Sequence, residues 1–248
     1  MKTIAVWFSC GAASAVAAKK TIELYPQHIV RVINNPVLEE DADNQRFLKD
    51  VEKWLGVTVE FAYNKKYPAA SAKEVWADRK FMSGIGGAPC TLELKKEARY
   101  QWEKDNHADH HVLGFTVDER HRHDRFIVTE RPLLPVLIDA GITKAMCFEI
   151  IKAAGIKLPR IYDMGYPNAN CIGCVKATSP TYWNHVRQQH PAVYADRAMQ
   201  SREIGARLVR HKGRRIFLDE LPVDAKGRSM KSMNTECGIF CEEDTKNV

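Results

Sequence analysis

Cysteines are the residues of this chain whose positions most clearly indicate chemistry. The sequence contains seven of them. Six stand where they could act as nucleophiles or metal ligands: Cys10, Cys90, Cys171, Cys174, Cys237 and Cys241. The last four form two pairs, Cys-Ile-Gly-Cys and Cys-Gly-Ile-Phe-Cys. The N-terminal segment has no signal-peptide pattern, so we expect a cytoplasmic protein whose thiols stay reduced. Reduced cysteines in this arrangement indicate thiol, iron–sulfur or zinc chemistry.

A run of small residues follows the first apolar segment of the chain. Residues 3–8 have the pattern of a buried strand, and residues 15–24 that of a helix. The loop between them can wrap a pyrophosphate, because its glycine allows close approach and the helix offers free N–H groups. The same run would also serve as a tight turn chosen for packing. The candidate nucleotide-binding residues are Ser9, Cys10, Gly11, Ala12, Ala13 and Ser14.

Strands and helices alternate through the first half of the sequence, which predicts a Rossmann-like α/β fold. The sheet should be parallel, with helices on both faces. Ligands of such sheets bind at the carboxyl ends of the strands, so the loops after residues 8, 63 and 117 should border one cleft. Asp118 and Glu119 are candidates there for a ribose or metal contact. A charged loop follows, in which Arg120 and Arg122 could bind phosphates.

Composition limits the classes of partner. Apolar residues make up 45% and charged residues 27% of the 248 residues, as in ordinary globular proteins. No apolar run is long enough to cross a membrane, so we expect no membrane partner. The net charge of +6 suits a polyanionic partner, either a nucleotide or nucleic acid.

We expect one domain over residues 1–208 and a basic, cysteine-bearing tail over residues 209–248. A homodimer is compatible with the sequence.

Several segments resemble one family in their order along the chain. Residues 8–14 resemble the PP-loop of the adenine nucleotide alpha-hydrolase superfamily, although Cys10 replaces a glycine and the usual acid is missing. Residues 90–95, Cys-Thr-Leu-Glu-Leu-Lys, are similar to a segment of phosphoadenylyl-sulfate (PAPS) reductase-like proteins, including phage members. Residues 113–119 and 141–144 also resemble that family, and residues 235–240 resemble its reductase tail. The resemblance implies a HUP-type fold and binding of an adenine nucleotide: PAPS, adenylyl sulfate, or ATP with Mg.

The same resemblance implies roles for the cysteines. Cys237 would be the tail thiolate that attacks the sulfur of a sulfonucleotide, and Cys10 in the loop is a second catalytic candidate. Cys90, Cys171 and Cys174 resemble ligands of a 4Fe-4S cluster, which Cys237 or Cys241 could complete. Independently of the resemblance, the two cysteine pairs could form a tetrahedral zinc site that fixes the tail. The candidate metal ligands are Cys90, Cys171, Cys174, Cys237 and Cys241.

Three functions follow from these observations. The first is a PAPS reductase-like enzyme that binds an adenine nucleotide and reduces a sulfonucleotide with cysteine thiols and an iron–sulfur cluster, using a thiol reductant. The second is an ATP-dependent sulfur transferase that thiolates tRNA or DNA and needs a sulfur donor. The third is a non-catalytic protein that binds zinc and a nucleotide. The basic charge favours the second, and the missing loop acid disfavours it.

Overall fold

A computed structural model describes residues 1–127 and 132–230 of the chain, and the described chain forms two compact units. The first, which we call the sheet unit, comprises Met1–Pro36, Ala42–Tyr63 and Ala98–Tyr162. The second, the cysteine unit, comprises Val37–Asp41, Asn64–Glu97 and the chain from Asp163 onward. The predicted boundary after residue 208 stays a prediction, because residues 231–248 lie outside the described part.

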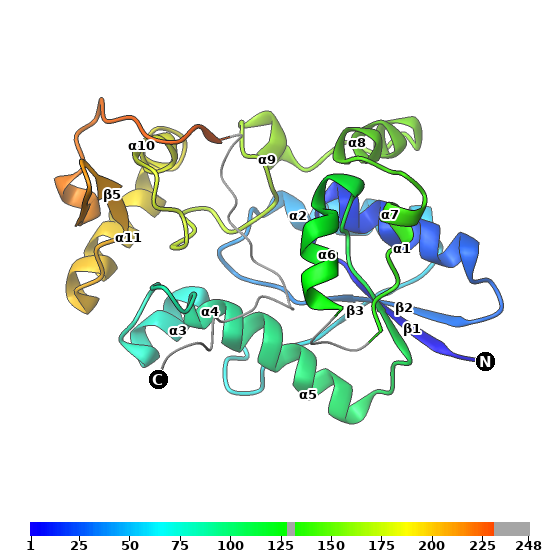
Figure 1. Ribbon diagram of the computed structural model, residues 1–248. Helices are drawn as coiled ribbons and strands as arrows, with labels where there is room; N and C mark the ends of the chain where they lie inside the picture. The colour runs from blue at the N-terminus through cyan, green and yellow to red at the C-terminus, as the bar shows by residue number, and fades with distance from the viewer. Residues whose placement is uncertain (128–131, 231–248) are drawn as a thin grey trace. The chain divides into compact units, whose positions relative to one another are not determined.

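The sheet unit is built on four parallel strands, which confirms the predicted fold class. They are β1 (Thr3–Trp7), β2 (Ile29–Asn34), β3 (Val59–Phe61) and β4 (His110–Val112). Their order is β3-β2-β1-β4, and all neighbours run parallel (Figure 1). The register places Val6 opposite Val32 and Val112. The carboxyl ends of the strands therefore lie at one edge, as predicted for the ligand-binding edge.

Helices cover both faces of this sheet (Figure 1). One face packs against α1 (Ala12–Leu24), α2 (Asp43–Leu55), α7 (Val136–Asp139) and α8 (Lys144–Ala153). The opposite face carries α5 (Ala98–Asp105), whose Trp102 ring lies 5.5 Å from that of Trp7. Alternate residues of β1 face opposite sides, so Val6 belongs to the first layer and Trp7 to the second. Burial of both faces is what a parallel sheet requires.

Local sequence signals set several helix ends. Ser71 caps the helix α3 (Ala72–Arg79) by accepting a hydrogen bond from the backbone N–H of Glu74. Thr143 caps α8 by accepting one from the backbone N–H of Met146. Gly56 ends α2 at φ +70°, in the left-handed region that favours glycine. These starts and stops were predicted from the sequence.

Three stretches differ from their predicted structure. The charged stretch after Glu119 is helical, as η2 (Val117–Glu119) and α6 (Arg120–Phe126), because His123 and Phe126 share a buried face three residues apart. The apolar residues 112–117 have the pattern of a strand, but the strand in the structure is β4 (His110–Val112), which is shorter and starts earlier. The sequence pattern also predicts a helix over residues 194–208, but the helix there is α11 (Pro191–Ile204), which starts at a proline and ends before Gly205.

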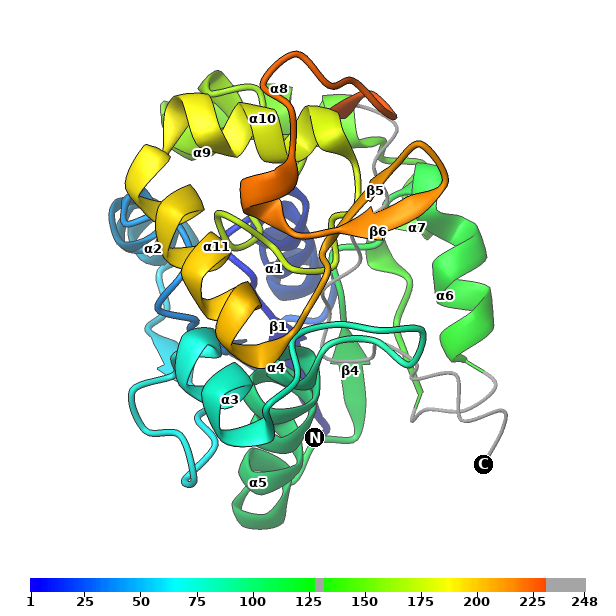
Figure 2. The same ribbon diagram turned by 90° about the vertical axis from the view of Figure 1, so that its left-hand side faces the viewer.

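The cysteine unit is mainly helical, with one small hairpin. Its elements are α3 (Ala72–Arg79), α4 (Pro89–Thr91), the π-helical turn η1 (Leu92–Glu97), α10 (Pro180–Gln189), α11, β5 (Val209–His211), β6 (Arg214–Ile216) and η3 (Leu218–Glu220). The short helix α9 is Arg160–Asp163. β5 and β6 are antiparallel neighbours (Figure 2). Among residues 1–127 and 132–230, no helix combines the length and the apolar character needed to cross a bilayer.

Candidate functional site

The loop between β1 and α1 is held in one shape by its two serines. The Oγ of Ser14 accepts a hydrogen bond from the backbone N–H of Ser9 (3.1 Å) and donates one to the carbonyl of Gly11 (2.9 Å). The Oγ of Ser9 lies 3.2 Å from that of Ser14. Cys10 turns the chain at φ +56°. The serine hydroxyls thus lie together at the start of α1, whose N-terminal N–H groups favour an anion.

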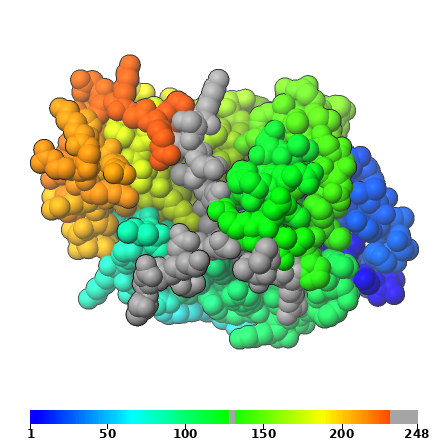
Figure 3. Space-filling model, in the orientation of Figure 1, coloured from blue at the N-terminus to red at the C-terminus, as the bar shows by residue number. Residues whose placement is uncertain are grey.

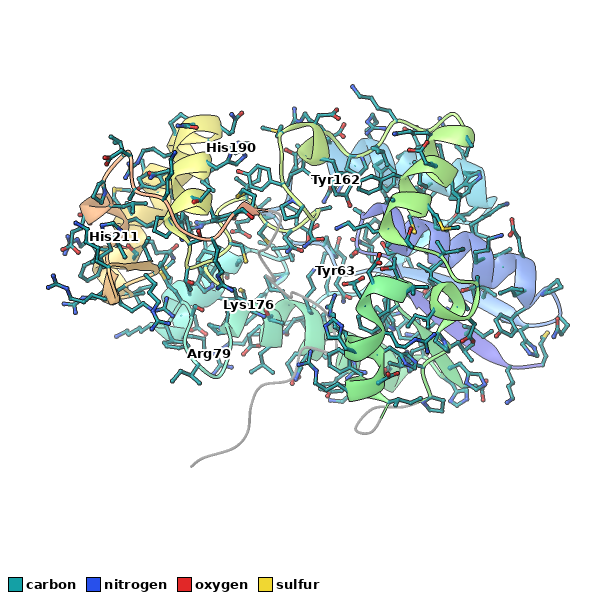
Figure 4. All side chains as sticks on the ribbon, turned by 45° about the horizontal axis from the view of Figure 1, so that its top comes forward. Tyr63, Arg79, Tyr162, Lys176, His190 and His211 are labelled. Atoms are coloured by element: carbon teal, nitrogen blue, oxygen red, sulfur yellow. The ribbon has the colours of Figure 1, made fainter. Side chains whose placement is uncertain are left out.

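Gly11 lies close to a residue far along the chain. A Cβ at this position would lie 3.4 Å from the hydroxyl of Tyr162 and 3.7 Å from the Oγ of Ser9. The same hydroxyl accepts a hydrogen bond from the backbone N–H of Ala12 at 3.4 Å. Tyr162, which lies in α9 and is labelled in Figure 4, therefore contacts the loop.

Tyr162 also connects the loop to a second group of charged residues in the sheet unit. Burial, with a smaller contribution from the charges of Cys147, Cys10 and Glu119, raises its pKa to about 12. The hydroxyl is therefore protonated at neutral pH and can donate a hydrogen bond to an anion. Glu119 was predicted as a site residue, and the structure brings it into the same neighbourhood as the loop.

The acids after β4 are engaged by cations and backbone donors. Asp118 accepts a hydrogen bond from the backbone N–H of Lys144 (3.1 Å), and Glu119 forms an ion pair with Arg122. The Arg122 guanidinium lies 4.8 Å from the Phe115 ring centroid. Burial lowers the pKa of the Lys144 amine, which the carboxylate of Glu119 partly counters. Two predicted residues, Glu119 and Arg122, are thus paired with each other, while Arg120 is exposed.

Gly114, which follows β4 in the chain, allows the backbone there to lie directly against the start of α1. A Cβ on Gly114 would lie 2.6 Å from the backbone nitrogen of Ser14 and 2.9 Å from its Cα. No real Cβ tolerates such a distance from backbone atoms, so any side chain here must displace the loop. The glycine therefore sets the position of the loop relative to the sheet.

The loop cysteine is more enclosed than a typical nucleophile. The Cys10 side chain is 4% exposed, and the Nδ2 of Asn34 donates to its Sγ at 3.6 Å and to the carbonyl of Phe8 at 2.7 Å. Reactive cysteines are usually partly exposed and close to cations. The catalytic role of Cys10 stays a prediction.

The structure places Cys90, Cys171 and Cys174 in the cysteine unit, apart in sequence but in one compact body. Gly173 makes the turn between the paired cysteines at φ +70°. The backbone N–H of Cys174 donates to the hydroxyl of Tyr182 at 2.7 Å. A small hollow adjoins the pair, and these residues line it: Tyr166, Pro167, Asn168, Asn170, Cys171, Cys174 and Tyr182.

The predicted metal ligands are only partly within the described chain. Among residues 1–127 and 132–230, no three His, Cys, Asp or Glu side chains are arranged to hold a metal ion. The role of Cys90, Cys171 and Cys174 as metal ligands stays a prediction. Cys237 and Cys241 lie outside the described residues, so the predicted metal set and the catalytic role of Cys237 stay predictions.

Sequence reasoning missed four residues of the loop site. Gly114 and Lys144 lie inside segments that resemble the family, at residues 113–119 and 141–144, which was the available signal. Asn34 ends β2, where polar residues of a parallel sheet often face the ligand edge. Tyr162 had no signal in the sequence, because 150 residues separate it from its contact at Ala12.

Comparison with known proteins finds similarity in backbone structure but not in sequence. No protein-family model matches the sequence, and a search of curated proteins finds no match. A PAPS reductase from Candida auris, in its phosphate complex, has a TM-score of 0.46 and 11% identity over 68% of this chain and 80% of its own. The U34-tRNA thiolase NcsA from Methanococcus maripaludis, with its 4Fe-4S cluster, has a TM-score of 0.49 and 12% identity over 96% of this chain and 80% of its own.

Proposed function

We propose that this protein is an enzyme of sulfur metabolism that binds an adenine nucleotide at the Ser9–Ser14 loop and reduces a sulfonucleotide with cysteine thiols. The observation that carries the proposal is the loop itself. Two serine hydroxyls and the first N–H groups of α1 gather at the ligand edge of a parallel sheet. Phosphate oxygens are the ligands that such a loop suits best.

The surroundings of the loop fit a nucleotide that carries several negative charges. The protonated hydroxyl of Tyr162 can donate to a phosphate oxygen. Lys144 and Arg122 are cations close to Glu119, whose charge also acts on Tyr162. The loop lacks the acid that typically accompanies ATP with Mg, and this favours PAPS or adenylyl sulfate over ATP as the nucleotide.

The chemical step would belong to Cys237. Its thiolate attacks the sulfur of the nucleotide's sulfate, forming an S–S bond while the S–O bond to the nucleotide phosphate breaks. The phosphate leaves with the bonding electrons. A second thiol, from an external thiol reductant, then attacks the Cys237 sulfur, which releases sulfite and leaves a disulfide. Two thiols thus supply the two electrons of the reduction.

The test is production of sulfite from PAPS and from adenylyl sulfate in the presence of a dithiol reductant. Ser14→Ala should weaken nucleotide binding about tenfold, because it removes the hydrogen bonds to Ser9 and Gly11 that hold the loop in its shape. Ser83→Ala, at a half-buried serine elsewhere, is the matched control. Cys237→Ser should abolish sulfite release and retain nucleotide binding. Full sulfite release by Cys237→Ser would contradict the mechanism.

A second candidate is supported by a different observation. Residues 207–215 contain five Lys or Arg residues and no acid, as a nucleic-acid-binding segment would. This favours ATP-dependent sulfur transfer to tRNA or DNA. ATP hydrolysis that depends on added nucleic acid, with no sulfite from PAPS or adenylyl sulfate, would select this candidate. Iron and zinc contents of anaerobically purified protein would separately test the predicted metal.

A further inference from the structure

The hairpin formed by β5 and β6, residues 209–216, carries a concentration of positive charge. Its two central turn residues, Lys212 and Gly213, have φ of +47° and +77°, as in the tight turns that join antiparallel strands. Figure 2 shows the two strands side by side in the cysteine unit, and the orange segment that contains them reaches the surface in Figure 3. We call residues 209–216 the basic hairpin.

The base of the basic hairpin is fixed to its unit. Val209 is fully buried, and the backbone N–H of Arg210 donates to the carbonyl of Thr178 at 2.9 Å. The guanidinium of Arg215 donates to the carbonyl of Leu208 at 2.9 Å. A fixed base with exposed cations presents charge at a defined place instead of on a loose tail.

The register of the hairpin brings like charges together. Arg210 is opposite Arg215, and His211, labelled in Figure 4, is opposite Arg214. Like charges directly opposite on an antiparallel pair destabilise it, and this applies to Arg210 and Arg215. A hairpin selected for stability alone would place acids at some of these positions. Their absence indicates that the cations serve an external anion.

Neighbouring acids do not neutralise the basic hairpin. Asp219 and Glu220, which follow it in the chain, are both bound by Arg202, at 2.8 Å and 2.9 Å. Within residues 1–127 and 132–230, Arg210, Lys212 and Arg214 make no ion pair. The positive charge of the hairpin is therefore available to a partner.

The shape and composition of the hairpin distinguish among polyanions. A two-stranded ribbon fits the major groove of B-form DNA, which is about 12 Å wide, whereas the major groove of duplex RNA is too narrow. Single strands are bound by stacking on exposed aromatic rings. Phe217, which follows the hairpin in the chain, has its ring covered by the guanidinium groups of Arg202 (3.9 Å) and Arg207 (5.3 Å).

From these observations we infer that the basic hairpin binds the phosphate backbone of double-stranded DNA. The inference goes beyond the reductase proposed first, narrows the nucleic acid of the second candidate to duplex DNA, and does not depend on which nucleotide the Ser9–Ser14 loop binds. Binding is electrostatic, so its affinity falls steeply with salt and depends little on base sequence.

The test is fluorescence anisotropy of the full-length protein with a labelled DNA duplex of mixed sequence over a range of salt concentrations. The variant Arg210→Ala/Arg214→Ala should weaken binding by about tenfold or more and lower the slope of log affinity against log salt by about 2, one unit for each lost phosphate contact. The control Lys53→Ala/Lys104→Ala removes the same charge from exposed lysines elsewhere and should bind as the wild type does.

Three results would overturn the inference. Equal affinity and slope in the hairpin variant and the wild type would show that the hairpin does not contact DNA. Equal loss in both double variants would show an effect of net charge alone. Tighter binding to duplex RNA, single-stranded DNA or anionic lipid vesicles than to duplex DNA would assign the surface to another partner. Nucleotide binding, measured in parallel, reports separately on the Ser9–Ser14 loop.

Discussion

Gly114, at the end of β4, lies directly against the backbone of Ser14, at the start of α1. A methyl group on Gly114 would stand 2.6 Å from the Ser14 nitrogen. Two segments separated by a hundred residues thus meet without a side chain between them. Because Ser14 holds the loop through its contacts with Ser9 and Gly11, the position of the whole candidate site depends on this approach.

The variant Gly114→Ala tests that dependence. The added methyl must displace backbone, so we expect a loss of about 1–3 kcal/mol in the free energy of unfolding and weaker nucleotide binding. Urea denaturation and nucleotide titration would measure the two effects. Gly86→Ala is the matched control, because a Cβ there meets nothing within 4 Å. Unchanged nucleotide affinity in Gly114→Ala would show that the loop does not rely on the close contact.

Asp43 gives the sheet unit a pH-dependent contribution to stability. Its carboxylate accepts hydrogen bonds from the Arg46 side chain (2.7 and 2.8 Å) and from the backbone N–H of Arg160 (2.8 Å). The hydrogen bond from Arg46, more than any other cause, lowers the pKa of Asp43 from 3.8 to about 2. A lowered carboxyl pKa stabilises the fold above the unfolded-state value, and the stabilisation is lost as the pH falls towards 2.

We therefore expect Asp43→Asn to lower the free energy of unfolding by about 2 kcal/mol at neutral pH, with the difference shrinking below about pH 4. Urea denaturation of variant and wild type across this range would measure it. The exposed Asp139, replaced by Asn in the same way, is the control and should show little difference at either pH. A constant deficit for Asp43→Asn at all pH values would contradict an electrostatic origin.

The sequence predicted those parts of the fold that depend on neighbouring residues. The parallel sheet followed from alternating strands and helices, and the caps at Ser71 and Thr143 followed from local motifs. The loop from Ser9 to Ser14 was recognisable because its small residues are contiguous. The caps and the loop are each encoded within a few neighbouring residues, and the sheet by the order of short local patterns.

Features that depend on distant contacts could not be predicted in this way. Tyr162 contacts Ala12, 150 residues away, and no hydrophobic periodicity in the sequence predicts this contact. The charged stretch after Glu119 looked like a loop, because the burial of His123 and Phe126 that makes it helical depends on neighbours elsewhere in the fold. Cys237 and Cys241 lie outside the described residues, so their predicted roles stay untested.

Cys147 should be chemically silent in the folded protein. It is fully buried in α8, and burial raises its pKa to about 12. Since the thiolate is the reactive form, iodoacetamide should leave Cys147 unmodified at mildly alkaline pH while it modifies the partly exposed Cys171. Mass spectrometry of peptides before and after unfolding in urea would measure both. Equal labelling of the two cysteines in the native protein would show that α8 opens readily.

Gly173 should control the shape of the turn that carries Cys171 and Cys174. Its φ of +70° disfavours any other residue, and a Cβ would also lie 3.1 Å from Val193 Cγ1 and 3.3 Å from Arg197 Cγ. Gly205→Ala is the control, because Gly205 has φ +81° in the same unit but nothing within 4 Å of the added methyl. We expect Gly205→Ala to cost about 1–2 kcal/mol from the backbone alone. Gly173→Ala should cost more, because the methyl also displaces α11, and should change the rate at which Cys171 is alkylated. Equal costs and equal alkylation rates for the two variants would show that packing against α11 does not position the cysteine pair.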